Sequence, residues 1–191
     1  MGELISIIIV NYNGQRWLKK CLDSIYNQTY KNYEIILVDN NSTDNSIELV
    51  KNNFPKVNIL CSKKNLGFSG GNNLGIKKSK GNLIMLLNND TWVESNFLEK
   101  MEETYSKFNN AVIGPTEADY YSKESRIYSI HLDPFGHFIY LKGRNIRDND
   151  FYLSGVCLLF SKKLYYETGG LDSNFFMYGE DWDWFSVDQL R

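Results

Sequence analysis

Hydrophobic and polar positions along the first half of the chain fall into blocks with two different periods. Residues 4 to 10 read Leu-Ile-Ser-Ile-Ile-Ile-Val, a β-branched run that is typical of a strand buried on both faces. Residues 15 to 28 switch to the helical period, with Lys19, Lys20 and Asp23 facing away from an apolar stripe. The stripe consists of Trp17, Leu18, Cys21, Leu22 and Ile25. The pattern predicts a buried strand followed by an amphipathic helix.

The alternation of strand and helix patterns continues as far as residue 108. Further strands are expected at residues 34 to 38, 57 to 61 and 83 to 87. Further helices are expected at residues 43 to 54, from a Gly- and Asn-rich loop to about Lys80, and from a cap at Ser95 to Phe108. Successive strand–helix–strand units predict an α/β fold with a parallel sheet and right-handed crossovers.

The second half of the chain is less regular. Its candidate strands cover residues 111 to 115, 126 to 132, 135 to 141 and 154 to 160. Neither an internal repeat nor a low-complexity linker divides the sequence. We therefore expect a single domain over residues 1–191, made of a first half at residues 1–110 and a second half at residues 111–191.

Four consecutive expected strands end in polar, hydrogen-bonding segments. These segments are Asn11 to Gly14, Asp39 to Asp44, Asn65 to Gly75, and Asn88 to Asp90. Each one alone also fits an ordinary turn or helix cap, because Asn, Asp, Ser and Gly are turn residues. The carboxyl ends of parallel strands share one edge of the sheet, where ligands of such folds bind. Their coincidence at that edge favours a binding site.

Two familiar glycine motifs do not fit the third segment. A dinucleotide-binding fingerprint needs G-x-G-x-x-G directly after a strand, a spacing that the glycines at 67, 70, 71 and 75 do not have. A phosphate-binding P-loop needs Lys after its last glycine, where this chain has Ile76. The sequence therefore argues against a nicotinamide dehydrogenase and against a P-loop nucleotidase.

Acidic residues at two places suggest chemistry. Asp90 ends a strand beside Asn89, and one carboxylate with carboxamide oxygens suits a hard divalent cation that bridges two phosphates. Glu180, Asp181 and Asp183 lie together among aromatic residues, so mutual repulsion and partial burial should raise the pKa of at least one carboxyl, as a general base needs. The simpler alternatives are a turn at Asp90 and an acidic helix N-terminus at residues 180–183.

Composition and charge narrow the possible functions. The net charge of −2 gives no support for a nucleic-acid partner. The three cysteines fall in apolar segments without a C-x-x-C pair, which predicts buried, reduced thiols and a reducing compartment. His131 and His137 lack metal-ligand spacing. The N-terminal apolar run is far shorter than the ~20 residues of a membrane helix, which leaves peripheral membrane contact open.

Five pieces of the chain, taken in order, resemble the glycosyltransferases of family two, in the branch that includes rhamnosyltransferase-like enzymes. The pieces are Val10 to Asn13, Val38 to Asp44, Asn65 to Gly75, Leu86 to Asp90, and Gly169 to Asp181. The resemblance implies a GT-A fold, a Rossmann-like and mostly parallel sheet flanked by helices. It also implies transfer of a sugar from a nucleoside diphosphate sugar to an acceptor hydroxyl, with inversion at the anomeric carbon.

The resemblance also implies roles for individual residues. Tyr12 would stack on the nucleobase, Asp39 would hydrogen-bond it, and Asp90 would bind Mn²⁺ or Mg²⁺ in a motif of the D-x-D type. Asp181 would be the catalytic base, with Glu180 as its neighbour. The implied nucleotide-binding set is Asn11, Tyr12, Asn13, Asp39, Asn41, Asn65, Gly67, Gly71, Asn72 and Asn89. A single displacement needs no enzyme nucleophile, and the sequence carries no Ser-His-Asp pattern.

Two departures from the family pattern bear on activity. Asn88 or Asn89 replaces the first carboxylate of the metal motif, so metal affinity would rest largely on Asp90. Family members usually continue beyond the Glu-Asp pair with an Arg-bearing amphipathic helix, so we expect this chain to be shortened there. The alternative function is a non-catalytic, sugar-nucleotide-binding remnant. By the same analogy, the acceptor would be a saccharide or lipid-linked saccharide, in cell-surface polysaccharide synthesis at the cytoplasmic side of the membrane.

Overall fold

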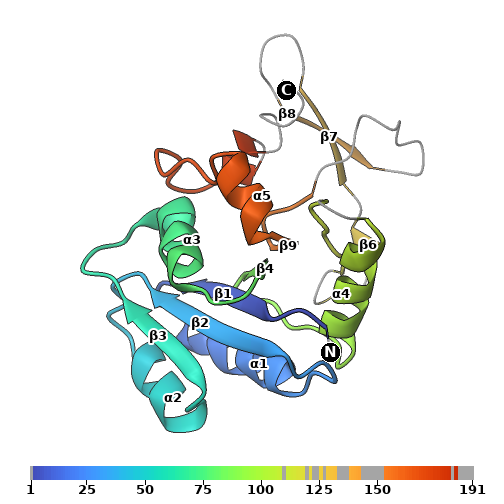
Figure 1. Cartoon of the computed structure of the whole chain (residues 1–191). Coiled ribbons are helices and arrows are strands. Elements are labelled where there is room, and N and C mark those ends of the chain that lie inside the picture. Colours follow the sequence, from blue (N-terminus) through green and yellow to red (C-terminus); the bar gives the residue numbers. More distant parts are fainter. Residues whose placement is uncertain are drawn as a thin grey trace.

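The structure is a computed structural model (Figure 1). It describes residues 2–108, 111–118, 121, 125–126, 128–132, 138–142, 153–181 and 183–184, and within 125–142 only the backbone. His137 and part of the candidate strand at 135–141 lie outside the described residues. Among the described helices, none is long and apolar enough to cross a lipid bilayer.

A five-stranded sheet forms the centre of the fold. Its strands, in chain order, are β1 (Ile5–Asn11), β2 (Tyr33–Asp39), β3 (Val57–Cys61), β4 (Leu83–Leu87) and β9 (Cys157–Ser161). The spatial order is β3-β2-β1-β4-β9. The first four strands are parallel to one another, whereas β9 runs antiparallel to β4. The mostly parallel α/β sheet predicted from the sequence is confirmed.

Helices cover both faces of this sheet (Figure 1). They are α1 (Gln15–Tyr26), α2 (Ser46–Asn53), α3 (Gly67–Lys78), α4 (Phe97–Lys107) and α5 (Lys162–Glu167). Alternate residues of β1 face opposite cores, because side chains along a strand alternate between its faces. Ile7 packs with the apolar side chains of α1, α2 and α4, whereas Ile8 packs with those of α3 and α5.

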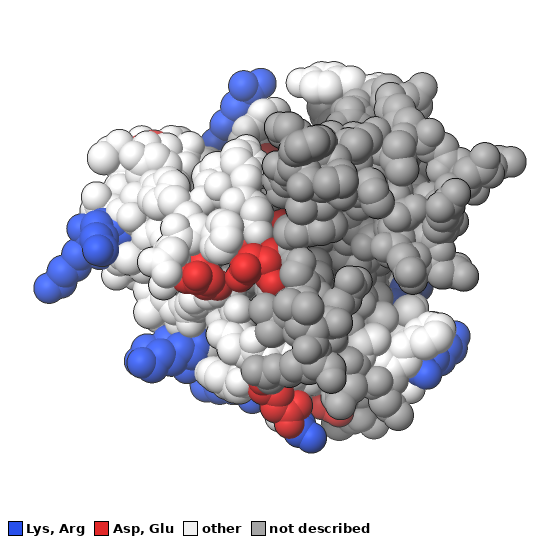
Figure 2. Space-filling view, turned by 90° about the horizontal axis from the view of Figure 1, so that it is seen from above, with Lys and Arg blue, Asp and Glu red and all other residues white. Residues whose placement is uncertain are grey.

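Four further strands lie between α4 and β9. They are β5 (Glu117–Ala118), β6 (Ser125–Arg126), β7 (Tyr128–Leu132) and β8 (Phe138–Lys142). β5 pairs with β6 and β7 pairs with β8, both antiparallel. The candidate strand at 111–115 contributes only an isolated bridge, from Ile113 to Leu159 of β9. Figure 2 views the molecule from the top of Figure 1 and shows Lys and Arg side chains projecting mainly at the rim of the described surface.

Two helix boundaries differ from the sequence prediction. The helix expected from residue 43 begins at Ser46, because the Asp44 carboxylate accepts a hydrogen bond from the Ser46 N–H at 3.0 Å and holds residues 43–45 as a loop. Ser95 is not the cap of α4. The residue at that position is Asn96, and the Ser95 carbonyl accepts from the Thr29 N–H at 2.7 Å instead.

The segment predicted as a Gly-rich loop is helical from Gly67 onward. Its glycines let α3 lie close against the sheet. A Cβ at Gly75 would come within 2.4 Å of the Ile8 side chain, and one at Gly71 within 2.8 Å of Val10. Close packing here outweighs the low helix propensity of glycine. The expectation of buried cysteines is correct for Cys21 and Cys157 and wrong for Cys61, which is exposed at the end of β3.

Candidate functional site

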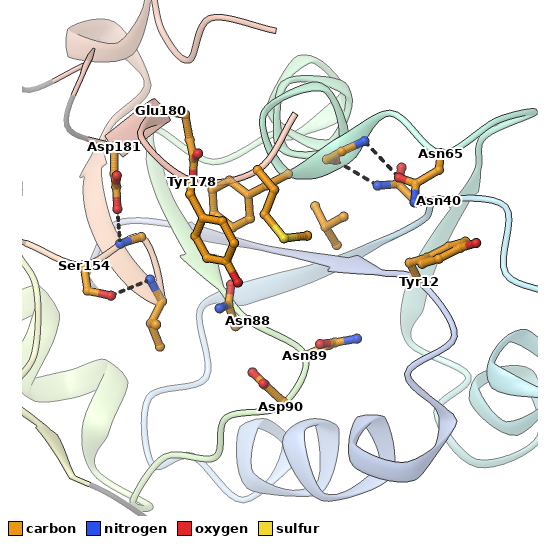
Figure 3. Close-up of a pocket in the computed structure, with 16 residues that line it drawn as sticks. Tyr12, Asn40, Asn65, Asn88, Asn89, Asp90, Ser154, Tyr178, Glu180 and Asp181 are labelled. Atoms are coloured by element: carbon orange, nitrogen blue, oxygen red, sulfur yellow. Dashed lines mark hydrogen bonds between the residues drawn. The ribbon is translucent and has the colours of Figure 1, made fainter. Parts of the chain in front are cut away.

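A cavity of about 490 Å³ opens at the carboxyl ends of the parallel strands (Figure 3). Residues from both halves of the chain line it. They are Val10, Tyr12, Asn40, Asn65, Gly67, Phe68, Asn88, Asn89, Asp90, Ser154, Gly155, Val156, Met177, Tyr178, Glu180 and Asp181. The position agrees with the rule that ligands of parallel α/β folds bind beyond the strand ends.

The cavity brings together seven of the residues singled out from the sequence. These are Tyr12, Asn65, Gly67, Asn89, Asp90, Glu180 and Asp181. The remaining residues of the expected nucleotide-binding set do not line it. These are Asn11, Asn13, Asp39, Asn41, Gly71 and Asn72.

Asn13 and Asn41 lie in the two interlocked loops after β1 and β2. Both adopt positive φ, 51° for Asn13 and 67° for Asn41, a region that Asn tolerates better than most residues. The Asn13 Oδ1 accepts hydrogen bonds from the N–H of Thr43 at 2.8 Å and of Asp44 at 3.3 Å. In return, the Asn13 N–H donates to the Ser42 Oγ at 2.9 Å. The Asn13 side chain therefore ties the two loops together.

Gly71 and Asn72 hold α3 in place. Gly71 packs against Val10, as described above, and Asn72 is buried with its Nδ2 donating to the Phe68 carbonyl at 3.0 Å. Both residues support the wall that Phe68 contributes to the cavity.

One side of the cavity carries an aromatic ring and two carboxamides. The Tyr12 side chain is 53% exposed and offers a free ring face. Asn65 accepts the Gly67 N–H on its Oδ1 at 2.9 Å, while Asn40 donates its Nδ2 to the Gly67 carbonyl at 2.9 Å. The Oδ1 of Asn40 is buried without a hydrogen-bond partner. Because a buried unsatisfied acceptor is costly, Asn40 is suited to receive a donor group from a ligand.

The N-terminus of α3 is covered by another segment of the chain. Gly67 adopts a φ of +71°, and a Cβ there would lie 2.2 Å from the Phe176 carbonyl oxygen. That carbonyl accepts the Phe68 N–H at 2.7 Å. Only glycine combines this backbone conformation with so close an approach. The contact fixes residues 176–178 above the start of α3.

Asn88, Asn89 and Asp90 follow β4 at the floor of the cavity. The Cys21 thiol donates to the Asn88 carbonyl from below, at 3.7 Å. Burial raises the pKa of this thiol to about 12, and the nearby Asp90 charge adds to the increase. The Asn89 Nδ2 donates to the Asn11 Oδ1 at 2.8 Å. That bond leaves the Asn89 oxygen for the cavity.

Asp90 and Asn89 fit a hard cation of the Mg²⁺ or Mn²⁺ type. Within the described part of the chain, no three His, Cys, Asp or Glu side chains gather into a metal cluster. A cation of this type needs no such cluster, because it takes one or two protein carboxylates and completes its shell with phosphate and water. In Figure 3 the Asn89 oxygen lies on the side of the Asp90 carboxylate and its nitrogen points away.

Glu180 and Asp181 face the cavity from the opposite wall, and both are buried, at 5% and 6% exposure. The Asp181 Oδ2 accepts the Gly155 N–H at 2.9 Å. The Glu180 Oε2 has no hydrogen-bond partner. Burial raises the pKa of Glu180, and the charge of Asp181 raises it further against an opposing backbone hydrogen bond. The predicted perturbation of a carboxyl pKa is thus found at Glu180.

Aromatic packing holds the helical turn that begins at Glu180. Trp184 is 3% exposed and meets Phe160 of β9 edge to face, with ring centroids 4.7 Å apart. It also contacts Tyr165 of α5, with centroids 5.8 Å apart. Its indole N–H donates to the Thr168 Oγ1 at 2.6 Å. The two carboxyls are therefore anchored through a buried tryptophan.

Sequence reasoning missed several lining residues, of which Asn40 and Tyr178 are the most informative. Asn40 directly follows the predicted strand and was hidden among turn-forming neighbours. Tyr178 is 83% exposed and adopts a φ of +70°, which is uncommon for a bulky residue. Figure 3 shows its ring over the middle of the cavity. The neighbouring run of aromatics was the only signal in the sequence.

Solved structures share this fold at low sequence identity. Staphylococcus aureus TarS 1-349 in complex with UDP superposes with a TM-score of 0.74 at 15% identity, over 94% of this chain and 53% of that chain. The mannosyltransferase PcManGT from Pyrobaculum calidifontis, in complex with GDP-Man and Mn²⁺, gives a TM-score of 0.68 at 16% identity, over 91% and 49%. The fold is thus that of the GT-A glycosyltransferases.

Sequence comparison identifies the family of glycosyltransferases to which the chain belongs. The family model "Glycosyl transferase family 2" matches residues 6–169, so the chain belongs to glycosyl transferase family 2. Glycosyltransferase GlyG of Streptococcus pneumoniae is 37% identical over 120 residues, covering 60% of this chain and 39% of GlyG. The Escherichia coli UDP-Glc:alpha-D-GlcNAc-diphosphoundecaprenol beta-1,3-glucosyltransferase WfaP is 39% identical over 94 residues, 48% of this chain and 37% of WfaP. The chain spans less than half the length of these two relatives.

Proposed function

We propose that this protein transfers a sugar from a nucleoside diphosphate sugar to an acceptor hydroxyl, with inversion at the anomeric carbon. The observation that carries the proposal is the composition of a single cavity. An exposed aromatic ring at Tyr12, a cation-binding pair at Asn89 and Asp90, and a buried carboxyl pair at Glu180 and Asp181 line the same space. In a one-step sugar transfer, these groups can stack on a nucleobase, hold a cation against the diphosphate and take the proton of the acceptor hydroxyl.

In this proposal, the carboxyl pair Glu180 and Asp181 activates the acceptor hydroxyl. The hydroxyl oxygen bonds to the anomeric carbon as the bond to the diphosphate breaks, and the hydroxyl proton passes to a carboxylate. Asp181 is the proposed base, because the Gly155 N–H fixes one of its oxygens and holds the carboxylate at the wall of the cavity. Glu180 lies beside it, and burial raises the pKa of Glu180 and so favours its protonated form, which makes Glu180 the less suitable base.

The opposite wall of the cavity binds the donor in this proposal. Tyr12 stacks on the nucleobase, and Asn40 and Asn65 lie where the ribose and diphosphate extend toward Asp90. Asp39 is 4% exposed, with its Oδ2 accepting the Ser42 N–H at 3.1 Å, and it anchors the loop behind Tyr12. Asp90 and Asn89 would hold Mn²⁺ or Mg²⁺, which when bound offsets the negative charge that develops on the departing diphosphate.

The proposed substrates follow the chemistry of the relatives. TarS and PcManGT are seen with UDP and with GDP-Man, and the name of WfaP gives a lipid-diphosphate-linked sugar as its acceptor. We propose a nucleoside diphosphate sugar as donor and a saccharide or lipid-linked saccharide as acceptor, in cell-surface polysaccharide synthesis on the cytoplasmic side of the membrane.

A thermal-shift experiment tests the donor site. UDP, GDP and dTDP are each added with and without Mn²⁺ to the wild type, to Asp90→Ala and to Asp23→Ala. Asp23 is a matched control because its carboxylate is exposed on α1, paired with Lys19 at 2.7 Å and remote from the cavity lining. We expect one nucleotide to raise the melting temperature in a Mn²⁺-dependent way, with the Mn²⁺ effect lost only in Asp90→Ala. No shift with any nucleotide would contradict the proposal.

Turnover of the donor separates an enzyme from a binding protein. The nucleotide found in the first experiment defines the donor sugars to supply, and release of free nucleoside diphosphate is then measured. Release by the wild type supports the transferase. Tight donor binding without any release, with or without saccharide acceptors, would favour the non-catalytic binding function instead.

A further inference from the structure

A buried hydrogen-bonded residue joins the two ends of the donor site. Asn11 is the last residue of β1 and is 0% exposed. Its Oδ1 accepts from the Asn89 Nδ2 at 2.8 Å. Its own Nδ2 donates to the Ser42 Oγ at 3.2 Å and lies 3.4 Å from the Asp39 Oδ1. Asn11 thus contacts both the nucleobase side and the cation side without lining the cavity.

This arrangement dictates which end of Asn89 faces the cavity. A carboxamide has one acceptor oxygen and one donor nitrogen, and the bond to Asn11 occupies the nitrogen. Turning the Asn11 amide over is unfavourable, because its oxygen would then face the Asp39 carboxylate oxygen and its nitrogen would face the Asn89 nitrogen. A carboxylate at position 89 would set an oxygen against the Asn11 oxygen. The chemistry of the neighbour therefore explains why this chain has Asn where an Asp would supply more charge.

Gly14 leaves the space in which this bond forms. A Cβ at position 14 would lie 2.2 Å from the Asn89 Nδ2 and 2.3 Å from the Asn11 Oδ1, the two atoms of the bond. The φ of Gly14 is −98°, which any residue can adopt. Position 14 therefore requires glycine because a side chain would displace the hydrogen bond beside it. The backbone conformation of Gly14 does not itself require glycine.

We propose that Asn11 is a positioning residue that turns the Asn89 oxygen toward the cation beside Asp90. The inference rests on the proposed function, since it takes a divalent cation to bind at Asp90. Partners of metal ligands that are themselves outside the coordination sphere commonly contribute about 10- to 100-fold to metal affinity. Asn11 would act in this way from inside the core, through one hydrogen bond.

Titration with Mn²⁺ alone tests the inference, with free Mn²⁺ followed by electron paramagnetic resonance. The proteins are the wild type, Asn11→Ala, Gly14→Ala, Asn89→Ala and the Asn11→Ala/Asn89→Ala double variant. Each single variant should bind Mn²⁺ about tenfold more weakly. The double variant should bind no more weakly than Asn89→Ala, because residues that act as one unit are not additive. Repeating the titration with the nucleotide that stabilises the wild type should give the same order.

Ser6→Ala is the matched control for lost stability. Ser6 is also 0% exposed and also lies on β1, but at the opposite end of the strand. Its Oγ donates to Glu34 at 2.6 Å and accepts the Gly81 N–H at 2.8 Å. The change should lower the melting temperature and leave Mn²⁺ affinity within about twofold of the wild type.

The outcomes separate this inference from the proposed function. Wild-type protein that binds Mn²⁺, with folded Asn11→Ala and Gly14→Ala variants that bind it equally well, would overturn the positioning role alone. Equal weakening by Ser6→Ala would also overturn it, because the effect would then report general destabilisation. A wild type that binds neither Mn²⁺ nor any nucleoside diphosphate would overturn the proposed function together with the inference.

Discussion

The two walls of the cavity are held by different kinds of interaction. On the donor wall, hydrogen bonds among Asn11, Asn13 and Ser42 lock the loops after β1 and β2 together. On the opposite wall, Glu180 and Asp181 begin a helical turn that a buried aromatic cluster around Trp184 holds, and the Gly155 N–H donates to the Asp181 carboxylate. Among the described residues, polar contacts between loops thus hold the donor wall, whereas the carboxyl wall combines aromatic packing with hydrogen bonds.

This difference suits the two tasks of the site. A nucleotide presents fixed hydrogen-bonding groups, so a preorganised set of loops lowers the cost of binding it. The carboxyl wall includes two successive residues at positive φ, Tyr178 at 70° and Gly179 at 89°. A positive φ is strained for Tyr178 and not for Gly179, and strained backbone persists where the surroundings hold it and often marks functional positions. The carboxyl wall and its contact with the start of α3 can both be tested by substitution.

The largest effect is expected from Asp181→Asn. The change keeps the shape of the side chain and its acceptor oxygen for the Gly155 N–H but removes the base. Transfer should fall by about 10²- to 10⁴-fold, while affinity for the donor nucleotide stays nearly unchanged because the donor wall is intact. Steady-state kinetics and nucleotide titration measure the two quantities. Normal turnover by the variant would show that Asp181 is not the base.

The next largest effect is expected from Gly67→Ala, which disrupts the contact of the start of α3 with the Phe176 carbonyl. A side chain here combines an unfavourable positive φ with a clash against the Phe176 carbonyl, so we expect a loss of about 1–3 kcal/mol in the free energy of unfolding. Chemical denaturation measures it. Gly70→Ala is the control, since Gly70 has ordinary backbone geometry and its Cβ would meet only the Leu66 side chain, at 3.0 Å. Equal stability of the two variants would mean that the Phe176 contact does not require glycine at position 67.

Trp184→Phe should have a somewhat smaller effect, of about 1–2 kcal/mol, from one lost hydrogen bond and a small cavity. The change retains an aromatic ring against Phe160 and removes the N–H that donates to Thr168. Thr168→Val removes the acceptor of the same bond, so the double variant should be little less stable than either single one. Full additivity in thermal denaturation would mean that this hydrogen bond does not hold the carboxyl wall.

The smallest effect concerns the pH dependence of stability. The folded-state pKa of Glu180 is raised by burial, so the protonated form is favoured by folding and its contribution is lost as pH rises through that pKa. Glu180→Gln carries no such proton. The stability of this variant relative to the wild type should therefore increase as pH rises from about 4.3 and then level off. Urea denaturation across that pH range measures it, and a constant difference would contradict the assignment.

The sequence predicted the sheet well because short runs rich in β-branched and aliphatic residues, bounded by polar turn residues, favour strands. The expected strands at 57–61 and 83–87 match β3 and β4. It placed the start of α3 too late, because the glycines at residues 67 to 75 predict a loop from their intrinsic propensity. Only the tertiary contacts of Gly71 and Gly75 with β1 explain a helix there.

The cavity brings together residues that the sequence singled out after a strand and in an acidic cluster. Asn89, Asp90, Glu180 and Asp181 were identified from clustered polar residues, and the cavity contains all four. The sequence could not separate Tyr12, which faces the cavity, from its neighbour Asn11, which faces the core. Where a strand ends, contacts with distant loops decide which way each side chain points. These contacts are visible only in the three-dimensional structure.

The unequal burial of the three cysteines has a practical consequence for labelling. Burial raises the pKa values of Cys21 and Cys157, so both thiols stay protonated at neutral pH and react slowly with electrophiles. Cys61 is exposed at the end of β3, four positions before Asn65. A maleimide fluorophore should therefore attach to Cys61 of the unaltered protein. From there, next to the donor wall, its fluorescence would report donor binding.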